Sequence, residues 1–478
     1  MKLQQLLDGV EYNTMLSADT QINTITCDSR RVEKGSLFVC IKGERFDGHD
    51  HAAKALEDGA AAVVCQRDLG LKEQILVSDS RLAYALLCRN FFGRACDRLK
   101  LIGVTGTNGK TTITFLIKHI LEAMGKKVGL MGTVENQIGD ITIQATHTTP
   151  DPFQLHSLFS RMVKAGCEYA VLEVSSHAMA QHRLAGCHFA CGIFTNLTQD
   201  HLDYHKTMEN YYLAKRSLFE MADLAVVNYD DEAGQRIMQE IKVPFVSYSV
   251  NKDDADYTAH GIIGMPAGSR FDFVGKQAIG RITFSMPGDY SVSNAMAAAA
   301  AVLELGFPVN KICAALTDCP GVPGRTEVIP TNRDFTVIRD FAHSPDGLEK
   351  VISTVRRFAK ADILVVFGCA GERDRTKRNK MTAIVSKLAD RVIFTLDNPR
   401  NEDPRQIEAD SIEGLNSTKT PYEVVDDRCE AIRRALAYCK KDDILLLLGK
   451  GHEDYQVLDF GTVNFDERKI VLQLLAEQ

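Results

Sequence analysis

The chain has 478 residues, a formal net charge of −7 and 45% hydrophobic residues. Because domains usually contain about 100–200 residues, this length is too great for one compact core and predicts roughly three domains. A mildly acidic chain without a dominant basic stripe argues against a nucleic-acid partner.

The cysteines and the apolar segments predict a protein of the cytoplasm. The 13 cysteines are spread over the chain without a CxxC pair, so we interpret them as reduced and mostly buried thiols. The N-terminal segment lacks the apolar core and cleavage site of a signal peptide. The longest apolar stretches, Ala295–Leu303 and Ile444–Leu448, fall far short of the ~20 residues needed to cross a bilayer. We therefore expect a cytoplasmic protein without a membrane partner.

The first expected domain covers residues 1–97 and combines short strand-like runs with one helical stretch. The helical stretch is His51–Asp58. The strand-like runs are Leu37–Ile41, Ala61–Cys65 and Gln74–Val77.

A glycine-rich loop after the apolar strand Leu101–Val104 opens the second expected domain, residues 98–328. Residues 102–112 read IGVTGTNGKTT, and the Gly-Lys-Thr at 109–111 matches the end of a Walker A loop. Glycines allow backbone N–H groups to approach phosphate oxygens, Lys110 can reach the terminal phosphates, and the Thr111 hydroxyl can hold Mg²⁺. The helix that follows points its positive end at the bound anion.

The match to the Walker A pattern is incomplete. The pattern has glycine at position 104, where this chain has Val104, and Gly103 and Gly106 flank that position. Because a strand precedes the loop and a helix follows it, we favour a nucleoside triphosphate site over a chance Gly-Lys-Thr turn. The loop alone does not define the reaction.

The second boundary lies near Pro320–Arg325, where two prolines and two glycines interrupt the pattern. In the third expected domain, residues 329–478, strand-like and helix-like stretches alternate, which predicts a parallel sheet with helices on both faces. We therefore expect an α/β protein of three domains, with a central P-loop ATPase-like parallel or mixed sheet and a Rossmann-like C-terminal domain. The expected C-terminal strands are Phe335–Phe341, Ile363–Cys369, Arg391–Leu396 and Ile444–Leu448, and the expected helices are Asp346–Phe358, Thr376–Leu388 and Arg428–Lys440.

The segment TGTNGKTT at 105–112 resembles the ATP loop of the Mur ligases and of the related folylpolyglutamate synthases. Further blocks resemble the same superfamily in the same order, so the resemblance spans the whole chain. These blocks are Glu173–His177, Asn196–Asp203, Tyr212–Lys215, Pro323–Glu327 and Asp340–Pro345.

Two blocks point to a narrower group of Mur ligases, the UDP-N-acetylmuramoyl-tripeptide synthetases. The first block, with Asp28–Arg30, Gly35–Phe38, Lys42–Gly43 and Asp47–His49, resembles a UDP-binding domain that folylpolyglutamate synthases lack. The second block, Asp397–Arg400, resembles the selectivity motif of the synthetases that add meso-diaminopimelate. The lysine-adding enzymes usually lack its arginine.

Two segments depart from the family pattern. Ser291 stands where the family often has asparagine, although Asn294 is kept, and Phe341 replaces a frequent tyrosine. These changes affect details of nucleotide contact and leave the expected reaction unchanged.

The resemblance implies an ATP-dependent amide ligase of cytoplasmic peptidoglycan precursor synthesis. Such an enzyme activates the D-glutamate γ-carboxylate of UDP-MurNAc-L-Ala-D-Glu as an acyl phosphate, and the amine of meso-diaminopimelate then displaces phosphate. ATP and Mg²⁺ are the implied cofactors, the two small molecules are the implied partners, and a monomer is the expected state. Catalysis of this kind depends on positioning and on neutralising negative charge.

The resemblance assigns site residues in four groups. The ATP-binding group is Gly106, Thr107, Asn108, Gly109, Lys110, Thr111, Thr112, Asn294, Arg325, Asp340 and His343. The group for the UDP-MurNAc dipeptide is Ser29, Gly43, His49, Thr148, Thr149, Ser175, Gln181 and Arg183. The amino-acid group is Arg373, Asp397, Asn398, Pro399, Arg400, Gly449 and Glu453. The catalytic residues are Lys110, Glu173, His201 and Lys215, and the metal ligands are Thr111, Glu173, His201 and Lys215 as its carbamate.

Residue type alone favours simpler interpretations for some of these positions. Lys215 would be one more solvated lysine on a helix over Tyr211–Glu220, whereas the resemblance implies a lysine that reacts with CO₂. Histidine is an unusual Mg²⁺ ligand, so His201 alone would more often be structural. The pair Thr148–Thr149 before a proline fits a helix start, and Asp397–Arg400 fits a turn after a strand.

Several alternatives stay open. The amino acid could be L-lysine, lanthionine or amidated diaminopimelate, although Arg400 left unpaired in a buried site would reject lysine. The chain could be another ligase of the superfamily or a non-catalytic UDP-sugar-binding protein. It could also be a P-loop NTPase of another role, against which the combination of Glu173, His201 and Lys215 argues.

Overall fold

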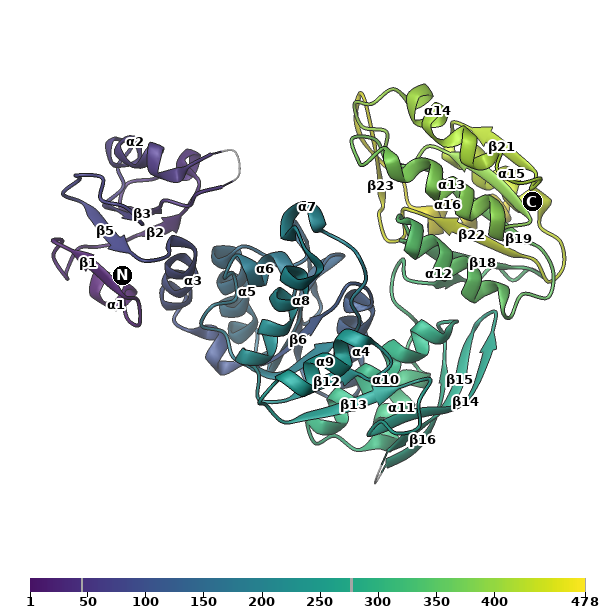
Figure 1. The fold of residues 1–478 in the computed structure, drawn as a ribbon, viewed down its shortest axis with the longest axis horizontal. Helices are drawn as coiled ribbons and strands as arrows, with labels where there is room; N and C mark the ends of the chain where they lie inside the picture. The colour runs from purple at the N-terminus through teal and green to yellow at the C-terminus, as the bar shows by residue number, and fades with distance from the viewer. Residues whose placement is uncertain (44–45, 276–277, 478) are drawn as a thin grey trace. The chain divides into compact units, whose positions relative to one another are not determined.

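The computed structural model describes residues 1–43, 46–275 and 278–477. The chain forms two compact units (Figure 1), and each contains sheets and helices of its own, which confirms the predicted α/β class. The expected domain boundaries after residues 97 and 328 stay predictions. The first unit is Met1–Tyr257 with Ala297–Pro308, and the second is Thr258–Met296 with Val309–Gln478.

The first unit begins with a five-stranded sheet in the order β1-β5-β4-β3-β2. β1 is antiparallel to β5, and the other neighbours are parallel. The expected strands and helix are present with slightly shifted ends, and α3 lies outside the expectation. The elements are α1 (Leu3–Leu6), β1 (Tyr12–Thr14), β2 (Thr24–Thr26), η1 (Ser29–Arg31), β3 (Ser36–Val39), η2 (Gly48–His51), α2 (Ala52–Glu57), β4 (Ala62–Cys65), β5 (Gln74–Val77), α3 (Ser80–Phe91) and η3 (Ala95–Arg98).

Strand β6 lies at the centre of the larger sheet of this unit, within the order β13-β12-β11-β6-β10-β7-β8-β9. It is parallel to both neighbours, and at the carboxyl ends Glu173 pairs with Val104 and Phe194 with Thr105. The loops after β6, β10 and β11 therefore meet at one edge, where α/β sheets bind ligands. The elements are β6 (Lys100–Thr105), α4 (Lys110–Ala123), β7 (Val128–Met131), β8 (Glu135–Ile138), β9 (Ile141–Gln144), α5 (Pro152–Lys164), β10 (Tyr169–Glu173), α6 (Ser176–Ala180), β11 (Phe189–Phe194), α7 (Leu202–His205), α8 (Met208–Arg216), η4 (Ser217–Met221), β12 (Ala225–Asn228), α9 (Glu232–Glu240) and β13 (Phe245–Ser249).

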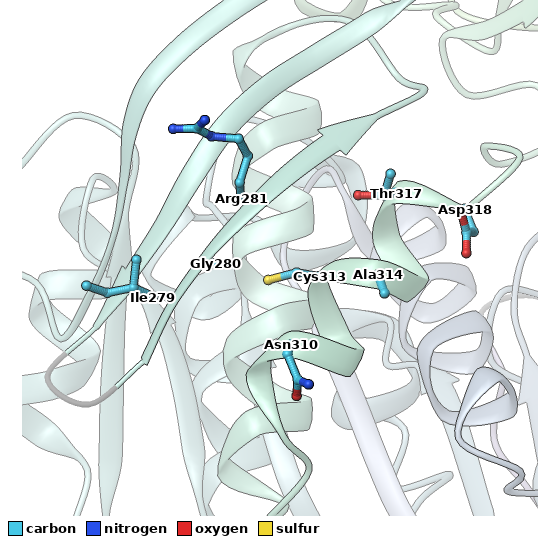
Figure 2. Close-up of a pocket in the computed structure, with 8 residues that line it drawn as sticks. All are labelled: Ile279, Gly280, Arg281, Asn310, Cys313, Ala314, Thr317 and Asp318. Atoms are coloured by element: carbon cyan, nitrogen blue, oxygen red, sulfur yellow. The ribbon is translucent and has the colours of Figure 1, made fainter.

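The second unit contains an antiparallel pair, β15 and β16, with helix α11 packed on β16. Figure 2 shows a hollow beside this contact, lined by residues 279–281 and by residues on and just after α11. A Cβ atom at Gly280 would lie 2.3 Å from Cys313 Sγ, so the close contact requires glycine. The expected site residues lie elsewhere. The elements are β14 (Tyr257–Met265), β15 (Gly268–Gly275), β16 (Ala278–Phe284), α10 (Asp289–Glu304) and α11 (Val309–Thr317). Tyr257 and the part of α10 from Ala297 onward belong to the first unit.

The rest of this unit contains an antiparallel pair, β23 and β24, and a six-stranded sheet in the order β17-β18-β22-β19-β20-β21. All neighbours in the six-stranded sheet are parallel except β17 and β18. Ile444, Leu446 and Leu448 pack with α12, α13 and α14, whereas Leu445 and Leu447 pack with α15 and α16 on the other face (Figure 1). The elements are β17 (Glu327–Ile329), β18 (Thr336–Asp340), α12 (Pro345–Arg356), β19 (Ile363–Phe367), α13 (Thr376–Leu388), β20 (Arg391–Thr395), α14 (Pro404–Leu415), β21 (Tyr422–Val425), α15 (Arg428–Tyr438), β22 (Ile444–Leu448), β23 (Tyr455–Leu458), β24 (Gly461–Asn464) and α16 (Glu467–Ala476).

The C-terminal strands and helices predicted from the sequence are all present. Helices α14 and α16 and strands β21, β23 and β24 were not predicted. For α14, Asp403 before Pro404 is a helix-start signal, and Asp403 caps the helix. The helix expected over Tyr211–Glu220 instead ends at Arg216 and continues as the 3₁₀ turn η4. Residues after the α-helix therefore follow a tighter path than the pattern predicts.

The cysteines are free thiols and most are buried, as expected. Burial raises the pKa of Cys40 to about 12 and that of Cys191 to about 12, so both are protonated at neutral pH. Among the described residues, no helix has the length and apolar character needed to cross a membrane.

Arg428 and Glu467 form an ion pair between α15 and α16, with both side chains 0% exposed and Nη2 2.7 Å from Oε1. We expect Arg428→Met to lower the free energy of unfolding by about 3–5 kcal/mol, because the remaining carboxylate is buried without its partner. Denaturant unfolding of the full chain measures this change. The double variant Arg428→Met/Glu467→Leu removes both charges and should recover most of the loss. Equal destabilisation of both variants would contradict the explanation.

Candidate active site

The phosphate loop connects β6 to α4. Gly106 and Gly109 have φ values of 141° and 91°, which L side chains rarely adopt. Helix α4 begins at Lys110 directly after Gly109, so its first N–H groups face the loop. Lys110 Nζ donates to Gly106 O at 2.9 Å and to Thr107 O at 2.7 Å, which places the ammonium over the loop backbone. This combination of N–H groups and one ammonium fits a polyphosphate.

The segment after β11 supports the same loop from the side. Thr107 N donates to Asn196 O at 2.8 Å, and Asn108 N donates to Asn196 Oδ1 at 3.0 Å. Thr195 Oγ1 donates to Asn108 O at 2.6 Å. Two of the blocks that carried the family resemblance are therefore in direct contact.

We expect Gly106→Ala to damage the loop, because its Cβ would lie 1.8 Å from Thr195 Oγ1. The free energy of unfolding should fall by about 1–3 kcal/mol. ATP-dependent turnover should fall by about 100-fold, since a displacement near 1 Å can cost that much. Steady-state kinetics and denaturant unfolding measure the two effects.

Gly125→Ala is the matched control for this variant. Gly125 also has a positive φ, of 76°, but no atom lies within 4 Å of the position that a Cβ would take there. This control therefore carries the backbone strain without the collision. If it lowers turnover as much as Gly106→Ala, the steric explanation is wrong.

Glu173 ends β10 beside the phosphate loop and is 1% exposed. Its carboxylate accepts hydrogen bonds from Thr133 N at 2.8 Å and from Thr133 Oγ1 at 3.0 Å. Thr111 and Thr112 are buried in the first turn of α4. Hydroxyl and carboxylate oxygens are the donors that Mg²⁺ prefers. Within the part of the chain that the structure describes, no three His, Cys, Asp or Glu side chains form a metal-binding group. The predicted Mg²⁺ ligands therefore stay a prediction, because they include the Thr111 hydroxyl and the carbamate of Lys215.

Lys215 lies on α8 and is only 1% exposed, although its residue type predicts a solvated side chain. Its Nζ donates to Gly106 O at 2.7 Å and lies 4.4 Å from the centre of the Tyr211 ring. Burial, and then the nearby charge of Lys110, lower the pKa of Lys215 well below its ordinary value. The structure therefore places a buried amine that loses its proton more readily than an ordinary lysine directly against the phosphate loop.

His201 belongs to a group of rings that the sequence did not identify as a cluster. The centre of its ring is 4.7 Å from that of His177, which is 4.4 Å from Tyr204 and 5.4 Å from His205. Burial lowers the pKa of His201 and of His177, and lowers that of His205 to about 4. These imidazoles are therefore neutral at pH 7 and able to use a ring nitrogen as an acceptor.

The central residues predicted for the UDP-MurNAc dipeptide lie together. Thr149 Oγ1 is 3.1 Å from Ser175 Oγ, and Arg183 Nη1 donates to Thr149 O at 2.7 Å. Arg183 also donates through Nε and Nη2 to Gln181 Oε1, at 3.1 and 2.8 Å. Thr148 adjoins this group. Helix α5 begins at Pro152, and its side-chain cap is Asp151, so neither threonine caps the helix.

The remaining three predicted residues for this ligand lie in the N-terminal sheet region. Ser29 is partly exposed in η1, and Gly43 is exposed. His49 is buried, with Nδ1 2.5 Å from Asp47 Oδ1 and Nε2 accepting from Gln66 N at 3.0 Å. Both ring nitrogens therefore have protein partners, which makes His49 a support for its loop. Ligand contact by these residues stays a prediction.

In the second unit, the predicted nucleotide residues lie around β18. Asp340 is buried and accepts backbone N–H groups at 2.6 and 2.8 Å, and burial raises the pKa of its carboxyl. The Arg325 guanidinium lies 4.8 Å from the centre of the Phe341 ring. His343 is exposed, with its ring 4.6 Å from that of Phe341. Asn294 is half-buried in α10.

Six of the seven predicted amino-acid residues, all except Arg373, lie in the loops after β20 and β22. Asn398 Nδ2 donates to Glu453 Oε2 at 2.8 Å. Arg400 has a positive φ of 54°, and its backbone N donates to Val457 O at 3.0 Å. Its Nη1 donates to Gly371 O at 2.5 Å, which leaves part of the guanidinium fork for a ligand.

The other members of this group take different positions. Asp397 is buried, and Gly449 packs beside it, since a Cβ added at Gly449 would lie 3.4 Å from Asp397 Oδ2. Pro399 is buried, and its carbonyl excludes any side chain at Gly371. Arg373 is exposed, and no described contact connects it with the group.

Two buried cations near this group were not predicted from the sequence. Lys450 is 0% exposed and lies among Asp397, Asn398 and Glu453. Arg378 is 2% exposed and donates to Glu402 at 2.7 Å, while the same carboxylate accepts from a backbone N–H at 2.7 Å. Lys450 comes two residues after the apolar strand β22, and a polar residue at the end of an apolar run is the signal that also identified Glu173 at the end of β10.

The geometry defines a P-loop nucleotide-binding protein with a buried lysine at its phosphate loop and a second polar group in its C-terminal sheet. Three family models match the chain. They are the Mur ligase family catalytic domain at residues 21–85, the Mur ligase middle domain at 104–302 and the Mur ligase glutamate ligase domain at 324–451.

The chain is similar over its full length to curated and solved proteins. It is 43% identical over 485 residues to the UDP-N-acetylmuramoyl-L-alanyl-D-glutamate–2,6-diaminopimelate ligase of Clostridium botulinum, with 100% of each chain covered. It is 44% identical over 490 residues to the enzyme of the same name from Clostridium tetani, again with 100% of each covered. A solved structure of a ligase with this name has a TM-score of 0.75 and 32% identity, and covers 100% of this chain and 99% of that one. The chain belongs to the Mur ligase family.

Proposed function

We propose that the chain catalyses the ATP-dependent addition of meso-diaminopimelate to the D-glutamate γ-carboxylate of UDP-MurNAc-L-Ala-D-Glu. The observation that supports it best is the buried Lys215 at 2.7 Å from Gly106 O in the phosphate loop. A simple NTPase has no need of a buried lysine there, whereas a ligase can use the carbamate of that lysine. The relatives that match the full length carry this activity in their names.

The residues of the first unit would bind and activate the carboxylate substrate. The loop N–H groups and Lys110 would hold the phosphates of ATP, and Thr149, Ser175 and Arg183 would hold the muramyl dipeptide. Thr111, Glu173 and His201, with Lys215 as its carbamate, are the proposed Mg²⁺ ligands. When bound, Mg²⁺ supplies positive charge that lowers repulsion between ATP and the attacking carboxylate.

The residues of the second unit would select the amine. Arg400 would bind the distal carboxylate of diaminopimelate through its fork, and Glu453 would bind an ammonium. The γ-carboxylate first takes the terminal phosphoryl group of ATP to become an acyl phosphate, and ADP leaves. The free amine then attacks the carbonyl carbon, and phosphate leaves as the amide forms and the amine nitrogen loses a proton. L-Lysine lacks the distal carboxylate and would leave the Arg400 charge without a partner.

Phosphate release in the presence of UDP-MurNAc-L-Ala-D-Glu, ATP and Mg²⁺ tests the proposal. Turnover with meso-diaminopimelate and little with L-lysine is the expected result. Turnover with L-lysine alone would keep the ligase and reject the selectivity assigned to Arg400. ATP hydrolysis that no amino acid stimulates would reject the ligase in favour of another NTPase role.

We further propose a monomer in the cytoplasm, where precursors of the cell wall are assembled. Every residue assigned to the reaction lies on one chain, so the proposal requires no second subunit. Light scattering of the purified protein should give the mass of one chain, 52.9 kDa. A stable dimer would contradict this part of the proposal.

A further inference from the structure

Lys450 is a buried lysine beside the amino-acid group, and the proposed reaction has no role for it. It lies two residues after the end of β22 and is 0% exposed. Lysine is almost never fully buried without a partner, and its ammonium carries three N–H donors. The groups around the ammonium therefore indicate its role.

Three acceptors surround the ammonium of Lys450. Nζ lies 3.2 Å from Asn398 Oδ1, 3.2 Å from Glu453 Oε2 and 3.5 Å from Asp397 Oδ1. Asn398 and Glu453 also contact each other, because Asn398 Nδ2 donates to Glu453 Oε2 at 2.8 Å. The amide of Asn398 is thus held at both ends. Its oxygen accepts from Lys450 and from Val457 N, the latter at 2.9 Å, and its nitrogen donates to Glu453.

The charges of this cluster do not cancel. Two carboxylates, Asp397 and Glu453, face one ammonium, which leaves one negative charge. Asp397 is 5% exposed and its Oδ1 accepts no hydrogen bond in the described part of the chain, so the Lys450 charge at 3.5 Å is what balances it. The Glu453 side chain is 17% exposed, and among the described residues its Oε1 has one long contact, with Tyr455 OH at 3.4 Å. Glu453 Oε1 is therefore the acceptor left for a ligand.

We propose that Lys450 is a positioning residue for the incoming amino acid, which orients Asn398 and Glu453 and balances Asp397, so that the site offers one carboxylate oxygen to one substrate ammonium. This inference rests on the proposed ligase function. Without Lys450, Asp397 and Glu453 would share the site as like charges, and Asn398 Oδ1 would keep only the hydrogen bond from Val457 N.

The test is Lys450→Met in the full chain, a substitution that keeps the length of the apolar stem. We expect the KM for meso-diaminopimelate to rise by about 10–100-fold, the usual cost of removing a group that orients ligands. The KM values for ATP and for UDP-MurNAc-L-Ala-D-Glu should stay within about threefold, because no contact to them is lost. A general structural defect would raise all three constants or lower kcat alone, and either pattern would overturn the inference.

A second variant tests whether misfolding explains the effect of Lys450→Met. Lys450→Met/Asp397→Asn removes the ammonium together with the carboxylate that it balances, so the cluster keeps a net charge of −1. We expect it to recover folding, measured by thermal melting, and part of the amino-acid KM. Failure of the double variant to improve on the single one would overturn the charge argument.

The wild-type protein separates this inference from the proposed function. If the wild type turns over no amino acid, the proposed function is wrong, and the inference falls with it. If the wild type uses meso-diaminopimelate and Lys450→Met leaves its KM unchanged, the inference alone is wrong.

Discussion

Lys215→Met is expected to lower kcat by about 10²–10³-fold while the protein remains folded, a loss typical of removing one preorganised electrostatic group. Lys215 is 1% exposed, and its pKa is well below the ordinary value because of burial and the charge of Lys110. A neutral amine reacts with CO₂ to give a carbamate and a proton, which converts a potential cation beside ATP into an anion able to hold Mg²⁺. Methionine fills the same space without this chemistry.

Two measurements distinguish the carbamate from a purely structural lysine. ¹³C NMR of the wild type in ¹³C-bicarbonate should show a carbamate signal that Lys215→Met lacks. Formate or acetate should restore part of the activity of a Lys215→Ala variant, since a small carboxylate can enter the space left by the side chain. Lys242→Met, at an exposed lysine of the same unit, is the control and should keep full activity. A normal kcat for Lys215→Met would reject the catalytic role.

Arg400→Met is expected to remove the preference for diaminopimelate over lysine. The kcat/KM for meso-diaminopimelate should fall by about 10²–10³-fold, because truncating one member of a buried hydrogen-bonded charge pair costs roughly 2–5 kcal/mol. The kcat/KM for L-lysine should change little, since lysine has no carboxylate for the fork. The left-handed backbone at Arg400, with φ 54°, and its 2.5 Å bond to Gly371 O hold the guanidinium in place.

Competition between the two amino acids measures this loss of selectivity directly. Arg405→Met provides the matched control, because Arg405 lies nearby in sequence, and its side chain is 69% exposed and paired with Glu408 and Asp426. It should leave both constants unchanged. If the Arg400→Met enzyme still prefers diaminopimelate, other residues determine the selectivity, and Glu453 is the first of these to test.

Local sequence patterns predicted the α/β class, the phosphate loop and most of the C-terminal strands and helices. Apolar runs such as Ile444–Leu448 mark buried strands, and the glycines at 106 and 109 mark a loop with positive φ, because both signals depend only on neighbouring residues. The segment of α14 is polar and weakly periodic, so its local pattern does not indicate a helix. Only the cap at Asp403 distinguishes it.

The tertiary structure decided the chemistry of individual side chains. Lys215 meets Gly106 across 109 residues of sequence, and Lys450 meets Asn398 across 52. Residue type predicts a solvated cation at both positions, yet the strand order β11-β6-β10 and the loops after β20 and β22 bury them against specific acceptors. Burial, charge balance and pKa depend on atoms that only the folded chain brings within a few ångströms, so no local pattern could have assigned them.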